Sequence, residues 1–297
     1  MPSIHTPVLM KEILEALNPS GDDVVFDGTL GGGGHSRALL EKLGPDGKLI
    51  AFDQDLEAVE RNQKEIEDDR VTFLHENFAN ATEAWLANQL PLANKVLLDL
   101  GWSSDQFANP ERGFSFQENG PLDMRLDTSN DKRLTAHDLV NTLNEEQLTG
   151  IIRNYGEERY AKRIAREIVY HRMEFGEIED TAGLVAVIKE AVPMSYQKTR
   201  IHPATRTFQA LRIAVNDELG VLERGLQGLL ATTQDTATIA VISFHSLEDR
   251  IVKHTFKQWK AEGIGTIVTK KPITASERET KDNPRARSAK LRVFTKQ

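Results

Sequence analysis

The sequence predicts an α/β protein with a doubly wound, mainly parallel sheet and an inserted, mainly helical domain. Strand-like and helix-like segments alternate four times within the first hundred residues. Residues 136–231 then have a helical pattern almost throughout, and strand-like segments return after residue 235. Because such alternation folds into parallel strands with right-handed crossovers, the two ends of the chain should form the sheet.

The first hundred residues contain four short apolar runs that are typical of buried strands. The run at 23–27 ends in an acid before a glycine cluster, and the helical pattern at 35–43 stops at Gly44-Pro45. Glycine and proline at these positions end the preceding element. The predicted strands are 23–27, 48–53, 71–75 and 95–100, and the predicted helices are 35–43, 56–67 and 79–90.

The pattern changes after residue 103. Residues 104–135 are polar and rich in turn formers, and helical patterns follow, for example at 157–172 and 205–230. Strands are predicted at 236–245, 265–270 and 288–295, and the last two should pair as an antiparallel closing ribbon. We therefore predict a discontinuous α/β domain at 1–108 and 213–297, with a helical domain inserted at 109–212.

Composition excludes several classes of site. The chain has 297 residues and no cysteine, which excludes disulfides, cysteine–zinc sites, iron–sulfur clusters and a cysteine nucleophile. No apolar run approaches the ~20 residues that cross a bilayer. The first residues lack the basic and apolar stretches of a signal peptide. We expect a cytoplasmic protein with no membrane partner.

The charge distribution is uneven. A net charge of −8 argues mildly against nucleic-acid binding, but residues 281–296 hold six basic residues and one acid, and residues 198–212 hold four basic residues and no acid. Local basic faces bind phosphates regardless of net charge. For each run the alternative is a solvated surface. The candidate phosphate contacts are Lys198, Arg200, Arg206, Arg285 and Arg287.

The first predicted strand leads into a loop with four consecutive glycines, Gly31 to Gly34. A dinucleotide site requires G-x-G-x-x-G/A at this junction, and no register of the loop fits that pattern. The acid before the loop, Asp27, would repel a pyrophosphate but suits a cation. S-adenosylmethionine carries a sulfonium and an ammonium, so the loop favours it over NAD; the alternative is a merely flexible turn.

The ends of the other strands also carry candidate ligands. In a parallel sheet Asp27, Asp53, residues 76–78 and Asp99 should converge on one edge, where ligands bind. Asp53 can accept both ribose hydroxyls of an adenosine, or it can be only a turn former. Phe78 can cover the adenine ring, and a core phenylalanine is an equal alternative.

The fourth strand ends at Asp99 and is followed by Leu100, Gly101 and Trp102. Amine methyltransferases usually carry an acid, asparagine or serine here, followed by Pro-Pro and an aromatic residue. This chain has the acid, a glycine turn and the aromatic residue without the prolines. Asp99 can thus accept from a target amine while Gly101 and Trp102 shape the pocket, or the segment can be a plain turn.

Many segments along the chain resemble the bacterial 16S rRNA cytosine-N4 methyltransferase family, also called MraW. The matching segments are 5–9, 27–36, 97–101, 112–116, 120–125, 155–159, 202–210, 243–250 and 283–288. Two positions depart from the family: Trp102 stands where valine is usual, and Asp105 stands where proline is frequent. Trp102 would therefore alter the acceptor pocket.

The resemblance implies a Rossmann-like S-adenosylmethionine-dependent methyltransferase sheet, with the insert at 109–212 recognising the substrate. It implies transfer to the N4 amine of a decoding-centre cytosine, with 16S rRNA in the small ribosomal subunit as partner. Asp99 would be the catalytic residue. The cofactor contacts it implies are Gly33, Gly34, His35, Asp53, Phe78, Asp99 and Gln106.

Two other function classes stay open from the residues alone: an NAD-linked oxidoreductase, and a non-catalytic RNA-binding module on the same fold. His245 follows the fifth strand and suggests a general base, although a structural histidine is favoured. The histidine spacing does not match H-E-x-x-H, and methyl transfer needs no Lewis acid, so we expect no catalytic metal. The oligomeric state is open, with a homodimer as one alternative.

Overall fold

The computed structural model describes residues 7–129 and 132–297 and divides into two compact units. One unit comprises Met1–Ser103 with Leu219–Gln297, and the other comprises Ser104–Glu218. The insert predicted at 109–212 lies within the second unit. His5 and Thr6, from the first segment that matches the family, lie outside the described residues.

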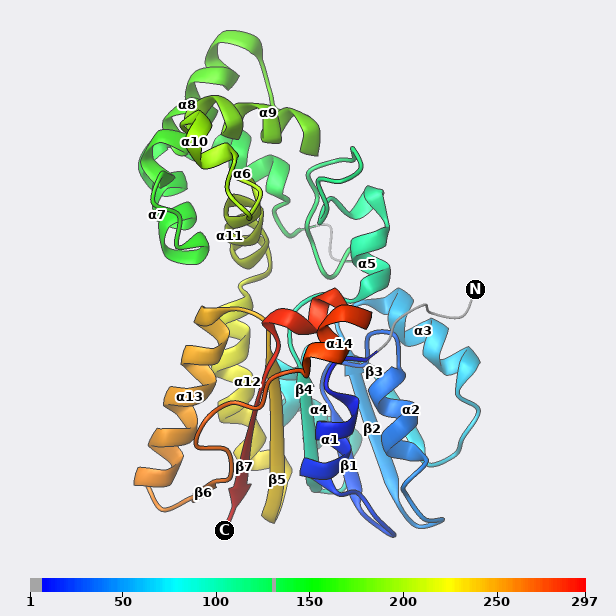
Figure 1. The fold of residues 1–297 in the computed structure, drawn as a ribbon. Helices are drawn as coiled ribbons and strands as arrows, with labels where there is room; N and C mark the ends of the chain where they lie inside the picture. Colours follow the sequence, from blue (N-terminus) through cyan, green and yellow to red (C-terminus); the bar gives the residue numbers. More distant parts are fainter. Residues whose placement is uncertain (1–6, 130–131) are drawn as a thin grey trace. The chain divides into compact units, whose positions relative to one another are not determined.

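The first unit is built on a seven-stranded sheet in the order β3-β2-β1-β4-β5-β7-β6 (Figure 1). The five strands from β3 to β5 run parallel, as predicted. Their bounds are Val24–Asp27 for β1, Lys48–Asp53 for β2, Val71–His75 for β3, Ala93–Asp99 for β4 and Thr233–Ser243 for β5. Because the strand order reverses direction between β1 and β4, the ligand crevice of such a sheet opens beyond their carboxyl ends.

Alternating side chains of these strands build two cores, one on each face of the sheet. Phe26 of β1 and Leu98 of β4 belong to one core, and the neighbouring Val25 and Leu97 belong to the other. The first core is covered by α4 (Ala81–Asn88), α12 (Glu218–Thr232) and α13 (Ser246–Ala261), and the second by α1 (Met10–Leu17) and α2 (Gly34–Leu40). Both faces of the sheet are therefore covered by helices and shielded from water, as is usual for parallel sheets.

The C-terminal strands close the sheet as an antiparallel ribbon, which confirms the prediction. β6 (Gly265–Ile267) pairs with β7 (Lys290–Lys296), and β7 also pairs antiparallel with β5. Between them lie α14 (Glu277–Asp282) and the 3-10 helix η3 (Pro284–Ser288). The remaining elements of this unit are α3 (Leu56–Glu65) and the 3-10 helix η1 (Phe78–Asn80).

The second unit is helical (Figure 1). Two of its helices begin with reciprocal caps, Thr135 with Asp138 in α6 and Asn144 with Gln147 in α7, which satisfy backbone N–H groups that helix starts leave unpaired. Its helices are α5 (Ser104–Ala108), η2 (Pro110–Arg112), α6 (Ala136–Thr142), α7 (Glu145–Gly156), α8 (Ala161–Phe175), α9 (Thr181–Ala191), α10 (Met194–Gln197) and α11 (Thr205–Asn216).

Two predicted helices differ from the structure because the chain turns within them. The segment 205–230 is divided between α11 and α12 by Asp217, which has a left-handed backbone with φ of 50°. The segment 157–172 starts late, since Glu157 caps α7 with φ of 48° and α8 begins at Ala161. Hydrophobic periodicity continues across both turns and therefore does not reveal them.

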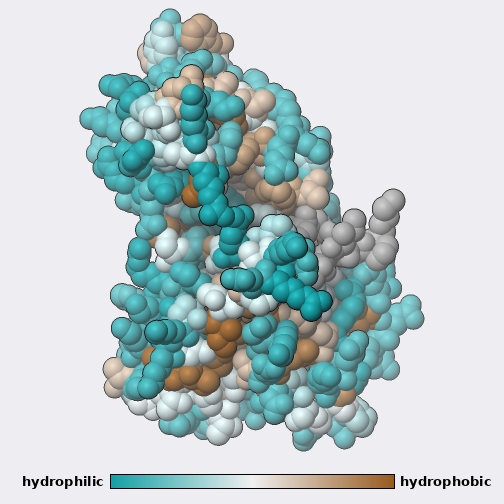
Figure 2. Space-filling model, in the orientation of Figure 1, coloured by the Kyte–Doolittle hydropathy of each residue, from teal (hydrophilic) through white to brown (hydrophobic). Residues whose placement is uncertain are grey.

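On the face shown in Figure 2 hydrophilic residues dominate both units. Within residues 7–129 and 132–297, no helix combines the length and the apolar character that a membrane span would need.

Candidate functional site

Three aspartates lie at one edge of the sheet because three neighbouring parallel strands end in them. Asp27 ends β1, Asp53 ends β2 and Asp99 ends β4. Asp27 aligns with Ala51 of β2 and with Leu97 of β4, so Asp53 and Asp99 each lie two residues beyond Asp27 along the strand direction. The edge is the one where doubly wound sheets bind ligands.

The Asp27 carboxylate holds the glycine loop and does not face outward. Its Oδ1 accepts from Thr29 N at 3.0 Å, and its Oδ2 accepts from Ser36 Oγ at 2.7 Å. The residue is 1% exposed. The expectation that Asp27 faces a cationic ligand is therefore corrected: its two oxygens fix the start and the end of the loop.

Asp53 holds the glycine loop and keeps the capacity to accept further hydrogen bonds. Its Oδ2 accepts from Gly31 N at 2.7 Å, and its Oδ1 accepts from Asp55 N at 2.8 Å. Each carboxylate oxygen has a second lone pair, so the group can still accept two hydroxyls. Burial raises the pKa of Asp53 to about 6, against the lowering effect of these two N–H donors.

Asp99 carries a buried oxygen with capacity for a ligand. Its Oδ2 lies 3.5 Å from His35 Nδ1, whereas Oδ1 has no hydrogen-bond partner among the described residues. Burial raises the pKa of Asp99 to about 7, the Arg285 charge lowers it and the Glu248 charge raises it again. An unpaired buried carboxylate oxygen is costly, so it marks a place where a donor group is expected to bind.

His35 presents an acceptor to Asp99. Its Nε2 lies 3.0 Å from the Val8 carbonyl, which can only accept, so Nε2 carries the hydrogen. Burial lowers the pKa of His35, against the raising effect of the Asp27 charge. The neutral ring therefore directs the Nδ1 lone pair at Asp99, and neither group supplies a proton to the other when Asp99 is ionised.

The glycine loop requires glycine at specific positions. Gly33 has φ of 73°, and an added Cβ would lie 1.9 Å from Asn62 Oδ1. At Gly34 an added Cβ would lie 2.4 Å from Pro7 Cγ, so the N-terminal segment packs directly against it. The loop is thus a tightly packed turn and not a flexible one.

Sequence reasoning missed the side chains that hold the loop carbonyls. Asn62 is fully buried, and its Nδ2 donates to Gly31 O and to Ala58 O, both at 2.9 Å. Arg37 Nη1 donates to Gly32 O at 2.8 Å, and Arg61 Nη2 donates to Gly31 O at 3.1 Å. The one feature of the sequence that could have indicated this role of Asn62 is its place on the inward face of a helix whose other polar residues are mostly charged.

Two predicted cofactor contacts, Phe78 and Gln106, are buried in the structure. Phe78 belongs to a buried core, and an added Cβ at Gly225 would lie 2.3 Å from its ring, which favours the core alternative. Gln106 is buried in α5 of the second unit. Their contacts with a cofactor stay predictions.

The loop after β4 is built from Gly101 and Trp102. Gly101 has φ of 93°, a conformation that side chains rarely adopt. The Arg285 guanidinium carbon lies 4.4 Å from the Trp102 ring centroid, and Arg285 Nη2 donates to Trp102 O at 2.6 Å. Trp102 is therefore already stacked on one side chain of the protein.

His245 caps a helix. It stands immediately before α13, where Glu248 N donates to its Nδ1 at 3.4 Å and the Glu248 carboxylate accepts from the N–H of His245 and of Phe244. This reciprocal capping box supports the structural interpretation of His245 over the general-base one.

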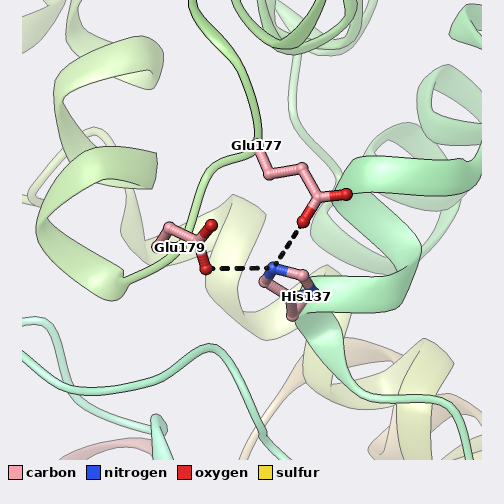
Figure 3. A group of neighbouring side chains, drawn as sticks. All are labelled: His137, Glu177 and Glu179. Carbon is pink, nitrogen blue, oxygen red and sulfur yellow. Dashed lines mark ion pairs between the residues drawn. The ribbon is translucent and has the colours of Figure 1, made fainter.

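A histidine and two glutamates gather in the second unit. His137 Nε2 lies 3.5 Å from Glu177 Oε2 and 3.5 Å from Glu179 Oε2 (Figure 3). The two glutamate side chains are 63% and 75% exposed. Such an exposed cluster forms surface ion pairs when the ring is protonated, and these contribute little stability.

Comparison with known proteins identifies the family. A model described as the MraW methylase family matches residues 2–297. The chain is 49% identical to ribosomal RNA small subunit methyltransferase H of Geobacter sp. (strain M21), over 98% of each chain. It is 46% identical to the protein of that name from Symbiobacterium thermophilum, over 98% of this chain and 96% of that one.

Among solved structures, an S-adenosylmethionine-dependent O-methyltransferase from Thermotoga maritima aligns with 100% of this chain and 67% of its own, at 8% identity and a TM-score of 0.45. The family model and the relatives cover almost the whole chain. The chain therefore belongs to the MraW methylase family and is a methyltransferase that uses S-adenosylmethionine.

Proposed function

We propose that this chain methylates the exocyclic N4 amine of a cytosine in the decoding centre of 16S rRNA, within the small ribosomal subunit. The names of the relatives support the ribosomal substrate. The observation that carries the chemistry is the Asp99 carboxylate, whose buried Oδ1 has no partner among the described residues and stands beside the Gly101 turn.

The composition supports nitrogen over carbon as the methyl acceptor. Carbon-5 of a pyrimidine is a poor nucleophile, and enzymes that methylate it generally first add a cysteine thiolate to carbon-6. The chain contains no cysteine, so this covalent route is closed. An exocyclic amine needs no adduct; it needs its lone pair freed from ring conjugation and aimed at the methyl group, which is mainly positioning.

Each group at the strand ends has a separate task. S-adenosylmethionine supplies an electrophilic methyl group on a sulfonium. Asp53 would accept from the ribose hydroxyls, and the backbone of the loop around Gly33 would contact the cofactor. Asp99 Oδ1 accepts a hydrogen from the N4 amine, turns the nitrogen lone pair out of conjugation, and takes the proton that the nitrogen loses after transfer. A base with a pKa near the working pH is suited to this step.

Nucleoside mass spectrometry of the product tests the proposal. We expect purified small subunits incubated with the enzyme and cofactor to yield N4-methylcytidine at one position. Detection of 5-methylcytidine or of a methylated adenosine in the digest would refute the assignment of the amine. Binding of NAD but not of S-adenosylmethionine would refute the reaction class.

Asp53→Ala is expected to weaken cofactor binding by about tenfold or more, because hydrogen bonds to a charged group contribute roughly 1.5–3 kcal/mol. Calorimetric titration of S-adenosylmethionine measures the change. Asp46→Ala is the matched control, since it removes an exposed carboxylate from the opposite end of β2. Equal affinity of Asp53→Ala and the wild type would remove Asp53 from the site.

Cofactor affinity is expected to fall as the pH drops through about 7 and then 6. Burial raises the pKa of Asp99 to about 7 and that of Asp53 to about 6, and protonation removes the charge that attracts a cationic ligand. In the free protein these raised pKa values have the opposite effect, because ionising the two groups costs stability as the pH rises. The thermal shift produced by the cofactor should therefore grow between pH 5.5 and 8, and a constant shift would contradict this prediction.

Charge removal at the basic runs is expected to weaken RNA binding without changing cofactor affinity. Lys198, Arg200 and Arg287 are exposed, and Arg206 is half-buried with Nη1 donating to Glu157 O. Each lost phosphate contact should lower the salt slope of RNA binding by roughly one. Lys11→Gln, at an 80% exposed side chain, is the control. An unchanged slope in the variants would show that the runs are only solvated surface.

The proposed substrate implies a role for the insert and a cellular compartment for the enzyme. Residues 109–212 would recognise the ribosomal RNA, and the enzyme would act in the cytoplasm, where small subunits are assembled. The salt-slope measurement on Lys198 and Arg200, compared with Arg287, tests whether the insert carries most of the RNA affinity.

A further inference from the structure

Arg285 and Trp102 are joined by two contacts although 183 positions separate them. The Arg285 guanidinium carbon lies 4.4 Å from the Trp102 ring centroid, which is a cation–π distance. Arg285 Nη2 also donates to the Trp102 carbonyl at 2.6 Å. One side chain thus holds both the ring and the backbone of the residue three places after Asp99.

The arginine comes from a firmly held segment. It lies in η3, whose Ala286 is 1% exposed and donates its N–H to Asn283 O at 3.0 Å. The next residues enter β7, where Lys290 pairs with Ser243 of β5, and β5 in turn pairs with β4 at Asp99. Because the sheet fixes both partners, the contact has a defined geometry and is not a chance meeting of surface side chains.

Arg285 also acts on Asp99 through its charge. His35 of α2 lies 3.5 Å from Asp99, and the charges of Glu248 in α13, Asp27 in β1 and Arg285 in η3 act on Asp99 electrostatically. His35 is neutral, and Asp27 and Glu248 are acids, so Arg285 is the cation of this set. It opposes the burial and the neighbouring acids, which both favour the protonated form of Asp99.

We propose that Arg285 is a positioning residue for methyl transfer: it fixes the loop that follows Asp99 through Trp102, and its charge keeps Asp99 in the acceptor form. The proposal rests on the role proposed above for Asp99. In this proposal Arg285 differs from the other arginines and lysines of the basic runs, which are expected to contact phosphates, because its guanidinium contacts the Trp102 ring and carbonyl. The competing interpretation is a purely structural link that holds the C-terminal segment.

Tryptophan fluorescence of the free protein tests the contact without cofactor or RNA. The chain has three tryptophans; Trp85 and Trp259 are buried, and Trp102 is half-buried. A difference spectrum against Trp102→Phe isolates the Trp102 emission. We expect Arg285→Gln to change its wavelength and its quenching by acrylamide, whereas Arg278→Gln, at a 94% exposed arginine of the same region, should not.

The titration of Asp99 tests the charge. In free protein with ¹³C-labelled aspartate, Asp99→Asn identifies the Asp99 carboxyl signal. We expect Arg285→Gln to move its midpoint upward by roughly one pH unit, as loss of a close opposite charge does. Arg285→Lys keeps the charge, so its midpoint should stay near that of the wild type while the Trp102 emission changes.

Turnover separates positioning from a structural link. At saturating cofactor, Arg285→Gln should lose roughly tenfold or more in kcat at pH 7 and recover part of this loss at pH 9. Arg285→Lys keeps the charge, so its loss in kcat relative to the wild type should be about the same at every pH. At pH 9, where Asp99 is ionised in the wild type and in both variants, the KM for the cofactor should change little. Equal losses at all pH values in Arg285→Gln, with an unmoved Asp99 midpoint, would establish the structural link and overturn the proposal. A wild-type enzyme that forms no N4-methylcytidine would refute the proposed function alone, since the fluorescence and the titration are measured on the free protein.

Discussion

Asp99→Ala is expected to abolish turnover, by roughly a hundredfold to ten-thousandfold, while the protein stays folded. The variant loses the acceptor for the N4 hydrogen and the base that takes the proton. The fold should tolerate the change because the carboxylate is buried, has a pKa raised to about 7, and leaves Oδ1 without a partner among the described residues. Removing such a group relieves a cost of ionisation, so the melting temperature should hold or rise.

Two further measurements assign the role of Asp99. Asp99→Asn keeps an oxygen that accepts a hydrogen bond but cannot take a proton, and we expect it to be nearly as slow as Asp99→Ala at saturating cofactor. If Asp99 only binds the cofactor, saturating concentrations should restore kcat in both variants. A kcat above about one tenth of the wild-type value in Asp99→Ala would remove this residue from the chemistry.

Gly33→Ala is expected to reduce cofactor affinity by about a hundredfold or more and to destabilise the protein. Alanine at φ of 73° costs roughly 1–2 kcal/mol, and its Cβ would lie 1.9 Å from Asn62 Oδ1. Asn62 is fully buried and donates to the Gly31 carbonyl, so it cannot move without releasing the loop. Loss of that buried hydrogen bond adds roughly 1–3 kcal/mol. Calorimetry and thermal denaturation measure the two effects.

Gly21→Ala provides the matched control for Gly33→Ala. Gly21 also has a positive φ, of 46°, but an added Cβ there meets nothing within 4 Å. It should therefore cost only the backbone strain and leave cofactor affinity unchanged. Adding Asn62→Ala to Gly33→Ala should relieve the clash and restore part of the lost stability. Wild-type affinity in Gly33→Ala would show that the loop adjusts freely, contrary to its packing.

Local patterns in the sequence determined most of the α/β unit. The apolar run at 48–53 became β2 with the predicted bounds, because a strand buried on both faces leaves a continuous apolar signature. The run at 71–75 became the edge strand β3, also with the predicted bounds, although its residues are only partly buried or exposed. Asp27, Asp53 and Asp99 could be assigned to one edge from the pattern, since parallel strands place their carboxyl ends together. The absence of cysteine likewise closed one chemical route on composition alone.

The tertiary structure alone decided what each of those aspartates does. Asp27 and Asp99 are both acids at strand ends. The two oxygens of Asp27 accept hydrogen bonds from Thr29 and Ser36, whereas Asp99 keeps an oxygen without a partner among the described residues. The sequence likewise did not predict the contact between Arg285 and Trp102 or the hydrogen bond from Asn62 to the Gly31 carbonyl. These pairings join residues far apart in the chain, and they depend on how the crossovers bring elements together in space. Periodicity and local motifs report on neighbours within a few residues, so they predict the strands and their ends but not the partners that tertiary packing brings to them.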